Sequence, residues 1–198
     1  ERFVARFTDK LIVVSYHDKQ KGLDNHIGDE SKYHLIRYGI DYLRFSLIDT
    51  NIRKELGIDT DDLVVGMVSC FKPQKAPQDF IRLALLVNKK LPEVKFILVG
   101  DGVLRSRIEA LIDKAHLRGN IILTGWRRDI DMILPAIDVF VLTSLWEGLP
   151  IAVVEAVASS IPVVATNTGG VAEVIFDGKT GFLVSPHDIE GMSEKLTL

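Results

Sequence analysis

The sequence predicts an α/β protein with a doubly wound, Rossmann-like parallel sheet. Short runs of β-branched residues, apolar on both faces, alternate with segments whose apolar residues recur at helical spacing. Strands of this kind are typical of a parallel sheet that helices cover on both sides. Because right-handed crossovers bring the carboxyl ends of such strands to one edge of the sheet, we expect a ligand to bind at that edge.

The predicted elements follow one another in the order that this fold requires. Strands are predicted at 11–15, 63–69, 94–100, 120–125, 138–144, 161–166 and 181–184. Helical spacing connects Phe80, Leu83, Ala84, Val87 and Leu91, and again Leu104, Ile108, Leu111, Ile112 and Ala115. A third helix is predicted over 151–158, because Pro150 suits the start of a helix.

The beginning of the chain does not follow this alternation. The apolar run at 11–15 is followed by polar residues over 16–32, which leaves no second long apolar segment to pack against it. We interpret residues 1–35 as the remnant of a preceding domain with its linker, 34–41 as the crossing, and 36–198 as the main domain. An isolated strand is expected to pack back on its own domain or to pair with a second copy in a dimer.

Composition excludes several classes of protein. With 47% hydrophobic and 26% charged residues, the chain has the composition of a globular protein. Its net charge of −3 argues against general binding of nucleic acid. Cys70 is the only cysteine, which excludes an internal disulfide and a zinc box. The apolar runs are far shorter than the roughly 18 residues of a membrane span, and we find no signal peptide, so we expect a cytoplasmic location.

Glycines follow most of the predicted strands. They are Gly100, Gly102, Gly125, Gly148, Gly169 and Gly170. Turn geometry alone accounts for any one of them, because glycine adopts positive φ without strain. Several glycines at one sheet edge also let backbone N–H groups approach an anion beside helix N-termini.

One short motif could be read as a metal site. Asp-Ile-Asp at 129–131 has the form of a paired metal ligand, but it is better explained as the cap of a helix through 133–137. We therefore predict no metal site.

The strongest anomaly is a single carboxylate on an apolar helix. Residues 151–158 are apolar on every face except at Glu155, so we expect this helix to be buried. A buried carboxylate is costly unless it is paired or hydrogen-bonded. One explanation is an ion pair with arginine or lysine, and the other is a ligand with a vicinal diol, such as a ribose. Glu147 lies eight residues earlier, on a loop that leaves a strand, and can reach the same pocket.

A long segment of the chain resembles glycosyltransferase family 4, a group of retaining nucleotide-sugar transferases with the two-domain GT-B architecture. The Glu-x7-Glu signature of that family matches SLWEGLPIAVVEAVASSIPVVATNTGGVAEVIFDGKTGFLVSP at 144–186. It is preceded, in the family's order, by VSCFKPQKAP, FILVGDG, LTGW and DVFVLTS. The resemblance covers 36–198 and is to the C-terminal, donor-binding half. Earlier segments, ARFTDKLIVVS and IRYGID, resemble the last strand of the acceptor domain and the interdomain linker.

The resemblance implies roles for residues that match the family's motifs. Glu155 would hold the ribose hydroxyls of the donor nucleotide. Glu147 would lie beside the transferred sugar, together with the backbone of Gly148 and Leu149. Lys75 would offset the charge that develops on the diphosphate leaving group.

Three further residues are implicated in donor binding. Trp126 falls where the family contacts the base, and Gly102 falls near the sugar-phosphate. The family usually has an arginine five residues before Lys75, where this sequence has Cys70. Lys72 is a candidate to replace part of that missing charge.

The implied activity is transfer of a sugar from a nucleoside diphosphate sugar, with UDP favoured, to a hydroxyl acceptor with retention of anomeric configuration. The resemblance implies no metal or other cofactor. The acceptor, a sugar or a lipid-linked hydroxyl, would be bound by an N-terminal domain that is mostly absent here. We therefore expect the fragment alone to bind a nucleotide without transferring sugar, and the longer enzyme to be compatible with peripheral membrane attachment. The alternatives are a GT-B nucleotide-sugar epimerase and a non-catalytic nucleotide-binding module.

Overall fold

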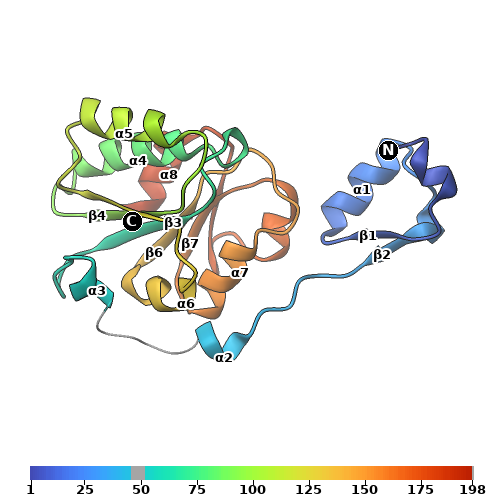
Figure 1. Ribbon diagram of the computed structural model, residues 1–198, viewed down its shortest axis with the longest axis horizontal. Helices are drawn as coiled ribbons and strands as arrows, with labels where there is room; N and C mark the ends of the chain where they lie inside the picture. The colour runs from blue at the N-terminus through green and yellow to red at the C-terminus, as the bar shows by residue number, and fades with distance from the viewer. Residues whose placement is uncertain (46–51, 198) are drawn as a thin grey trace.

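The computed structural model describes residues 1–45 and 52–197, and most of them form a six-stranded parallel sheet with its helices (Figure 1). Residues 46–51 and 198 of the predicted main domain lie outside the described residues. The strands are β3 (Val64–Val68), β4 (Lys95–Val99), β5 (Ile121–Gly125), β6 (Val139–Leu142), β7 (Val163–Thr166) and β8 (Gly181–Val184). Their order is β5-β4-β3-β6-β7-β8, so the winding reverses between β3 and β6. The predicted doubly wound fold is confirmed, and its switch point lies between these two strands.

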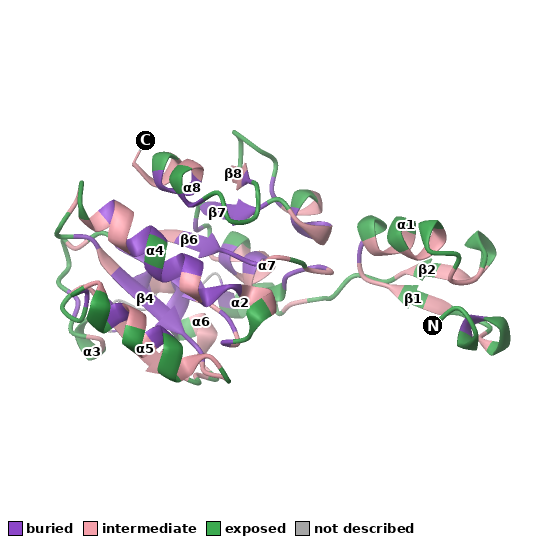
Figure 2. Cartoon of the chain, turned by 90° about the horizontal axis from the view of Figure 1, so that it is seen from above, coloured by how far each residue is buried: buried purple, intermediate pink, exposed green. Residues whose placement is uncertain are grey.

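Helices cover both faces of this sheet. One face carries α4 (Pro77–Asn88), α5 (Arg105–Lys114) and α8 (Ile189–Leu196), and the other carries α3 (Ile52–Glu55), α6 (Ile130–Ile133) and α7 (Ile151–Ala158). In β4, Phe96 and Leu98 belong to the first core, whereas Ile97 and Val99 belong to the second. This alternation is the pleat of a strand that is covered on both sides. Figure 2 shows β4, β6 and β7 as buried, as the continuous apolar runs predict.

Residues 1–36, here called the N-terminal unit, form a separate two-stranded sheet. The elements of this unit are the 3-10 turn η1 (Val4–Phe7), β1 (Leu11–Val13), α1 (Tyr16–Asp24), the 3-10 turn η2 (Glu30–Lys32) and β2 (Tyr33–Leu35). In Figure 1 this unit lies beside the main body, and a linker leads from it to α2 (Tyr42–Phe45).

The structure shows two features of this segment that the sequence analysis did not predict. The stretch 16–32 contains α1, whose N-cap Ser15 accepts a hydrogen bond from the backbone N–H of Asp18 at 3.0 Å. No residue of α1 is buried, so the helix needs no apolar stripe, and its sequence lacks the pattern by which a helix is recognised. Moreover, β1 pairs in parallel with β2, which begins at Tyr33, one residue before the predicted crossing at 34–41. The apolar strand thus has a partner within its own chain.

The prediction of a fully buried α7 was also wrong. Val153 and Ala156 are buried, but Ile151 is 44% exposed and Val157 is 38% exposed. One side of the helix packs on β6, β7 and α2, and the opposite side forms part of the surface. The helix is therefore a half-buried cover on one face of the sheet, in spite of its almost uniformly apolar sequence.

The expected helix after residues 129–131 is interrupted. It consists of α6 followed by a short 3-10 turn, η4 (Leu134–Ala136). Asp129 occupies the N-cap position, but its carboxylate makes no cap hydrogen bond and pairs with Arg127 at 2.6 Å. None of the helices in the described part of the chain combines the length and the hydropathy of a membrane-spanning segment.

Candidate active site at the carboxyl edge of the sheet

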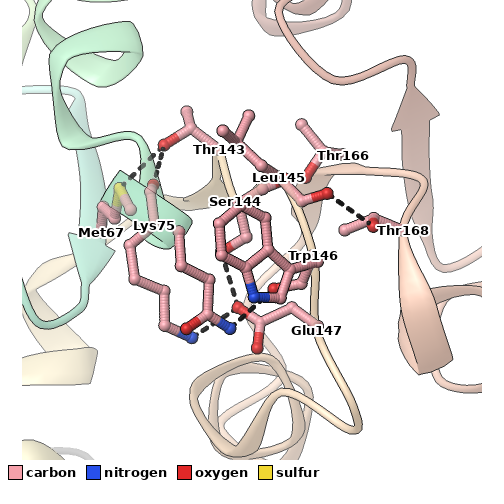
Figure 3. Close-up of polar contacts among 10 residues, drawn as sticks. Met67, Lys75, Thr143, Ser144, Leu145, Trp146, Glu147, Thr166 and Thr168 are labelled. Carbon is pink, nitrogen blue, oxygen red and sulfur yellow. Dashed lines mark hydrogen bonds and ion pairs between the residues drawn. The ribbon is translucent and has the colours of Figure 1, made fainter. Parts of the chain in front are cut away.

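The loops that follow β3 and β6 are joined at the switch point. The backbone N–H of Leu145 donates to the carbonyl of Gln74 at 2.8 Å, and the Gln74 side-chain amide donates to the carbonyl of Trp146 at 2.8 Å. The buried hydroxyl of Thr143 donates to the carbonyl of Lys75 at 2.9 Å. Figure 3 shows the contact between Thr143 and Lys75. These hydrogen bonds fix the backbones of the two loops that follow β3 and β6 relative to each other.

The loop after β7 supports the same structure from the other side. The hydroxyl of Thr166 donates to the carbonyl of Ser144 at 2.6 Å, and that of Thr168 donates to the carbonyl of Leu145 at 3.0 Å. Gly169 has a φ of +55°, and a Cβ there would lie 1.8 Å from the carbonyl oxygen of Glu147. Only glycine lets the two backbones approach this closely.

Lys75 and Glu147 meet on this rigid frame. The Nζ of Lys75 lies 2.5 Å from Oε1 of Glu147, and the hydroxyl of Ser144 donates to the same oxygen at 2.6 Å. The side chain of Glu147 is 6% exposed and that of Lys75 is 20% exposed. An ion pair this buried depends on both partners, because removing either leaves an uncompensated charge.

Glu155 has a different environment, on the half-buried face of α7. Burial raises the pKa of its carboxyl above the usual value, and the negative charge of Asp131 adds to that effect, while Arg44 opposes it. Arg44 itself forms an ion pair with Asp131 at 2.9 Å. Among the described residues, no hydrogen-bond donor contacts the Glu155 carboxylate. The nearby arginine is thus paired with Asp131 rather than with Glu155.

A hollow of about 200 Å³ lies beside β3 and β4 at the same sheet edge. Its lining includes Ser69, Cys70, Gly100, Trp126 and Arg127. Trp126 is 66% exposed, and Cys70 is half-buried. The Ser69 hydroxyl is buried and has no hydrogen-bond partner in the part of the chain that the structure describes. A buried hydroxyl without a partner is unusual in a folded protein.

Gly102 has a structural reason to be glycine. Its φ is +153°, and a Cβ there would lie 2.7 Å from the carbonyl oxygen of Phe71. The backbone N–H of Phe71 donates to the carbonyl of Asp101 at 2.8 Å, so the loops after β3 and β4 pack backbone to backbone. Close packing of loops therefore accounts for this glycine without a ligand.

The other predicted donor-binding residues lie around the same edge. Lys72 is exposed on the loop that carries Lys75, and Leu149 is buried just before α7. Gly148 faces the N-terminal unit, because a Cβ on it would lie 3.0 Å from Oδ2 of Asp18.

Sequence reasoning missed several polar residues of this region. They are Ser69, Gln74, Thr143, Ser144 and Thr166. A signal was present, since Ser69, Thr143 and Ser144 directly follow buried strands and Thr166 ends one. Polar side chains at the carboxyl ends of parallel strands belong to the edge where such sheets bind ligands.

The Asp-Ile-Asp motif does not form a joint site. Asp129 pairs with Arg127, whereas Asp131 pairs with Arg44. Over residues 1–45 and 52–197, no group of three or more histidine, cysteine or acidic side chains is arranged to hold a metal ion.

Comparisons with known proteins support this fold and show the family to which the chain belongs. The sequence profile of the family described as glycosyl transferases group 1 matches residues 48–198. The chain is 34% identical over 202 residues to an Escherichia coli protein named UDP-Gal:alpha-D-GlcNAc-diphosphoundecaprenol alpha-1,3-galactosyltransferase, covering 99% of this chain and 52% of that protein. The chain spans about half the length of the curated relatives that match it over 99% of its residues.

Solved structures show the same similarity. Anabaena HepE, in complex with UDP and glucose, superimposes with a TM-score of 0.89 at 26% identity, covering 98% of this chain and 54% of that chain. Staphylococcus aureus TarM, a mutant in complex with Fondaparinux, alpha-GlcNAc-glycerol and UDP, gives a TM-score of 0.83 at 26% identity, covering 97% of this chain and 37% of that one. The chain belongs to the group 1 family of glycosyl transferases.

Proposed function

We propose that this chain is the donor-binding half of a retaining, family 4 glycosyltransferase that transfers a sugar from a nucleoside diphosphate sugar to a hydroxyl acceptor. The observation that carries the proposal is the Lys75–Glu147 pair, buried between the loops of the switch point. The loop that holds Glu147 leads directly to the N-terminus of α7. The first backbone N–H groups of a helix lack intrahelical acceptors and favour an anion. A diphosphate at this position would meet both the helix and the ammonium of Lys75.

Lys75 would act on the leaving group. When the bond between the anomeric carbon and the diphosphate oxygen breaks, that oxygen takes the electron pair and its negative charge increases. An ammonium already held in place stabilises this charge without reorganising during the reaction. Lys72, exposed on the same loop, is proposed to approach the diphosphate from the solvent side.

Glu147 would position the transferred sugar. Lys75 and Ser144 both contact its Oε1. Within the described residues, Oε2 has no such contact and can accept a hydrogen bond from a sugar hydroxyl. The neighbouring backbone of Gly148 and Leu149 would complete this part of the site. This role predicts that, in the longer enzyme, Glu147→Gln lowers sugar transfer while barely altering the affinity for free UDP. Equal losses of transfer and of UDP affinity would contradict the role assigned to Glu147.

Glu155 and the hollow beside β3 would bind the nucleoside. The Glu155 carboxylate has no donor among the described residues, so the two hydroxyls of a ribose would complete its hydrogen bonding. The hollow, with its exposed Trp126, would take the base, near Gly102. UDP is the favoured nucleotide, since the Escherichia coli relative is named for UDP-Gal and HepE was solved with UDP.

The acceptor would be a sugar or lipid-linked hydroxyl, bound by residues outside the main domain. We propose that no metal ion takes part, because Lys75 and the N-terminus of α7 supply the positive charge. Transfer by the longer enzyme is accordingly expected to be insensitive to EDTA.

Three measurements test the proposal together. Calorimetry with UDP and GDP is expected to show binding to the 198-residue chain, with UDP preferred, and a labelled-donor assay is expected to show transfer only by the longer enzyme. The anomeric configuration of the product, read by NMR coupling constants, tests retention. Efficient transfer by this chain alone, an inverted product, or release of an epimerised sugar would each contradict the proposal. If the chain binds neither UDP nor GDP, the assignment of the donor site itself is wrong.

A further inference from the structure

Three segments of the chain meet at the carboxylate of Glu173. This residue ends η5 (Gly169–Glu173), the 3-10 turn after β7. The backbone N–H of His17, in the first turn of α1, donates to Oε1 of Glu173 at 3.1 Å. The guanidinium of Arg37, on the linker, donates to Oε2 at 2.5 Å. One side chain of the main body therefore binds both the N-terminal unit and the linker.

The arrangement is more specific than a surface ion pair. The Arg37 guanidinium also lies over the ring of Tyr16, 5.2 Å from its centroid, so it is held on two sides. Glu173 accepts from a backbone N–H in the first turn of α1, where the partial positive charge of the helix favours a carboxylate. The side chain of Glu173 is only 18% exposed, and that of Arg37 is 44% exposed.

The segment that carries Glu173 also supports the loop of Glu147. The backbone N–H of Gly170 donates to the carbonyl of Gly148 at 2.6 Å. A Cβ on Gly170 would lie 2.8 Å from the Cβ of Ser15, the N-cap of α1. The first turn of α1 therefore rests on η5 at the place where η5 rests on the Glu147 loop.

We propose that Glu173 docks the N-terminal unit, through α1 and Arg37, onto η5, the turn that supports the Glu147 loop. Its two oxygens have separate tasks: Oε1 holds the helix and Oε2 holds the linker. Because η5 contacts both α1 and the Glu147 loop, the docking sets how closely the N-terminal unit approaches Glu147. In the proposed transferase, that approach helps to exclude water from the reacting sugar.

Hydrogen exchange of the 198-residue chain, followed by mass spectrometry, tests the docking without any nucleotide. Glu173→Ala removes both contacts, and exchange over residues 15–20 is expected to accelerate at least tenfold, whereas β3 to β6 keep their protection. Glu173→Gln retains an acceptor for His17 but loses the charge that holds Arg37, so a smaller acceleration is expected. Asp113→Ala is the matched control, because it removes an ion pair in the main body, between Asp113 on α5 and Arg118 just after that helix.

A charge exchange tests the pairing itself. Arg37→Glu and Glu173→Arg are each expected to loosen the linker, measured as faster chymotryptic cleavage after Tyr38, which is 49% exposed. The double variant is expected to restore slow cleavage, but not the protection at residues 15–20, because an arginine cannot accept from His17. Unchanged exchange of α1 in Glu173→Ala, equal acceleration across the six-stranded sheet, or additive effects in the double variant would each overturn the proposal. No nucleotide enters these readouts, so they are independent of the proposed function.

Discussion

Glu147 and Glu155 are separated by eight residues, yet their carboxylates have opposite surroundings. Glu147 lies on a loop, where its side chain is buried and receives hydrogen bonds from Lys75 and Ser144. Glu155 lies on a regular helix, where it is half-buried and receives no hydrogen bond from any described residue. The regular element carries the unsatisfied group, and the loop carries the satisfied one.

The difference indicates when each carboxylate is stabilised. Glu147 is stabilised by folding itself, because its partners belong to loops that three strands hold in place. Glu155 is destabilised by folding, since burial raises the pKa of its carboxyl. Only a bound donor of hydrogen bonds would compensate it. Substitutions at the two sites should therefore have opposite effects on stability and on binding.

Lys75→Ala is expected to have the largest effect on stability. It leaves the Glu147 carboxylate buried without its cation, which typically costs about 3–5 kcal/mol. Lys72→Ala, on the same loop but exposed, is the control, and it should change the free energy of unfolding by less than about 0.5 kcal/mol. Urea unfolding measures both variants, and equal losses would show that the pair is not a structural unit.

Ser144→Ala is expected to have a smaller effect of the same sign. The hydroxyl donates to a charged carboxylate, and such hydrogen bonds contribute about 1.5–3 kcal/mol. Ser106→Ala, on the exposed side of α5, should be nearly neutral by comparison. If Ser144→Ala unfolds at the same urea concentration as the unsubstituted chain, the account of Glu147 as a group satisfied by folding is wrong.

Glu155→Gln is expected to have the smallest effect on stability, and its sign depends on pH. Folding raises the pKa of this carboxyl above its ordinary value of 4.5, so the folded state binds the proton more tightly than the unfolded state. Stability should therefore decline as pH rises from about 4.5 through the raised pKa. The glutamine variant lacks this decline and should melt at least as high as the unsubstituted chain at pH 7. A lower melting temperature there would reveal a structural ion pair instead.

The sequence predicts the sheet well because its strands are buried on both faces. In β4, for example, every residue from Phe96 to Val99 packs into a core, so a continuous apolar run is sufficient evidence. It predicts α1 poorly because that helix buries no residue and leaves no apolar stripe. The predicted burial of α7 is wrong for the converse reason, because the apolar residues Ile151 and Val157 lie on the surface.

The sequence singles out the charged residues of the candidate site, but it does not predict which side chains they contact. Lys75 and Glu147 stand out through motif resemblance, but their pairing joins positions 72 residues apart. Spacing within one sequence carries no information on such contacts. The same holds for Glu155, whose surroundings combine α7 with Asp131 from α6 and Arg44 from α2.

The most direct test of the central contrast measures binding of UDP and 2′-deoxy-UDP by calorimetry, in the unsubstituted chain and in Glu155→Gln. If Glu155 binds the ribose, each single change weakens binding by about 1–3 kcal/mol, as expected for lost charge-assisted hydrogen bonds. The two changes together should then cost little more than either alone, because both remove the same interaction. Additive losses, or full affinity of Glu155→Gln for UDP, would contradict the assignment of Glu155 to the ribose.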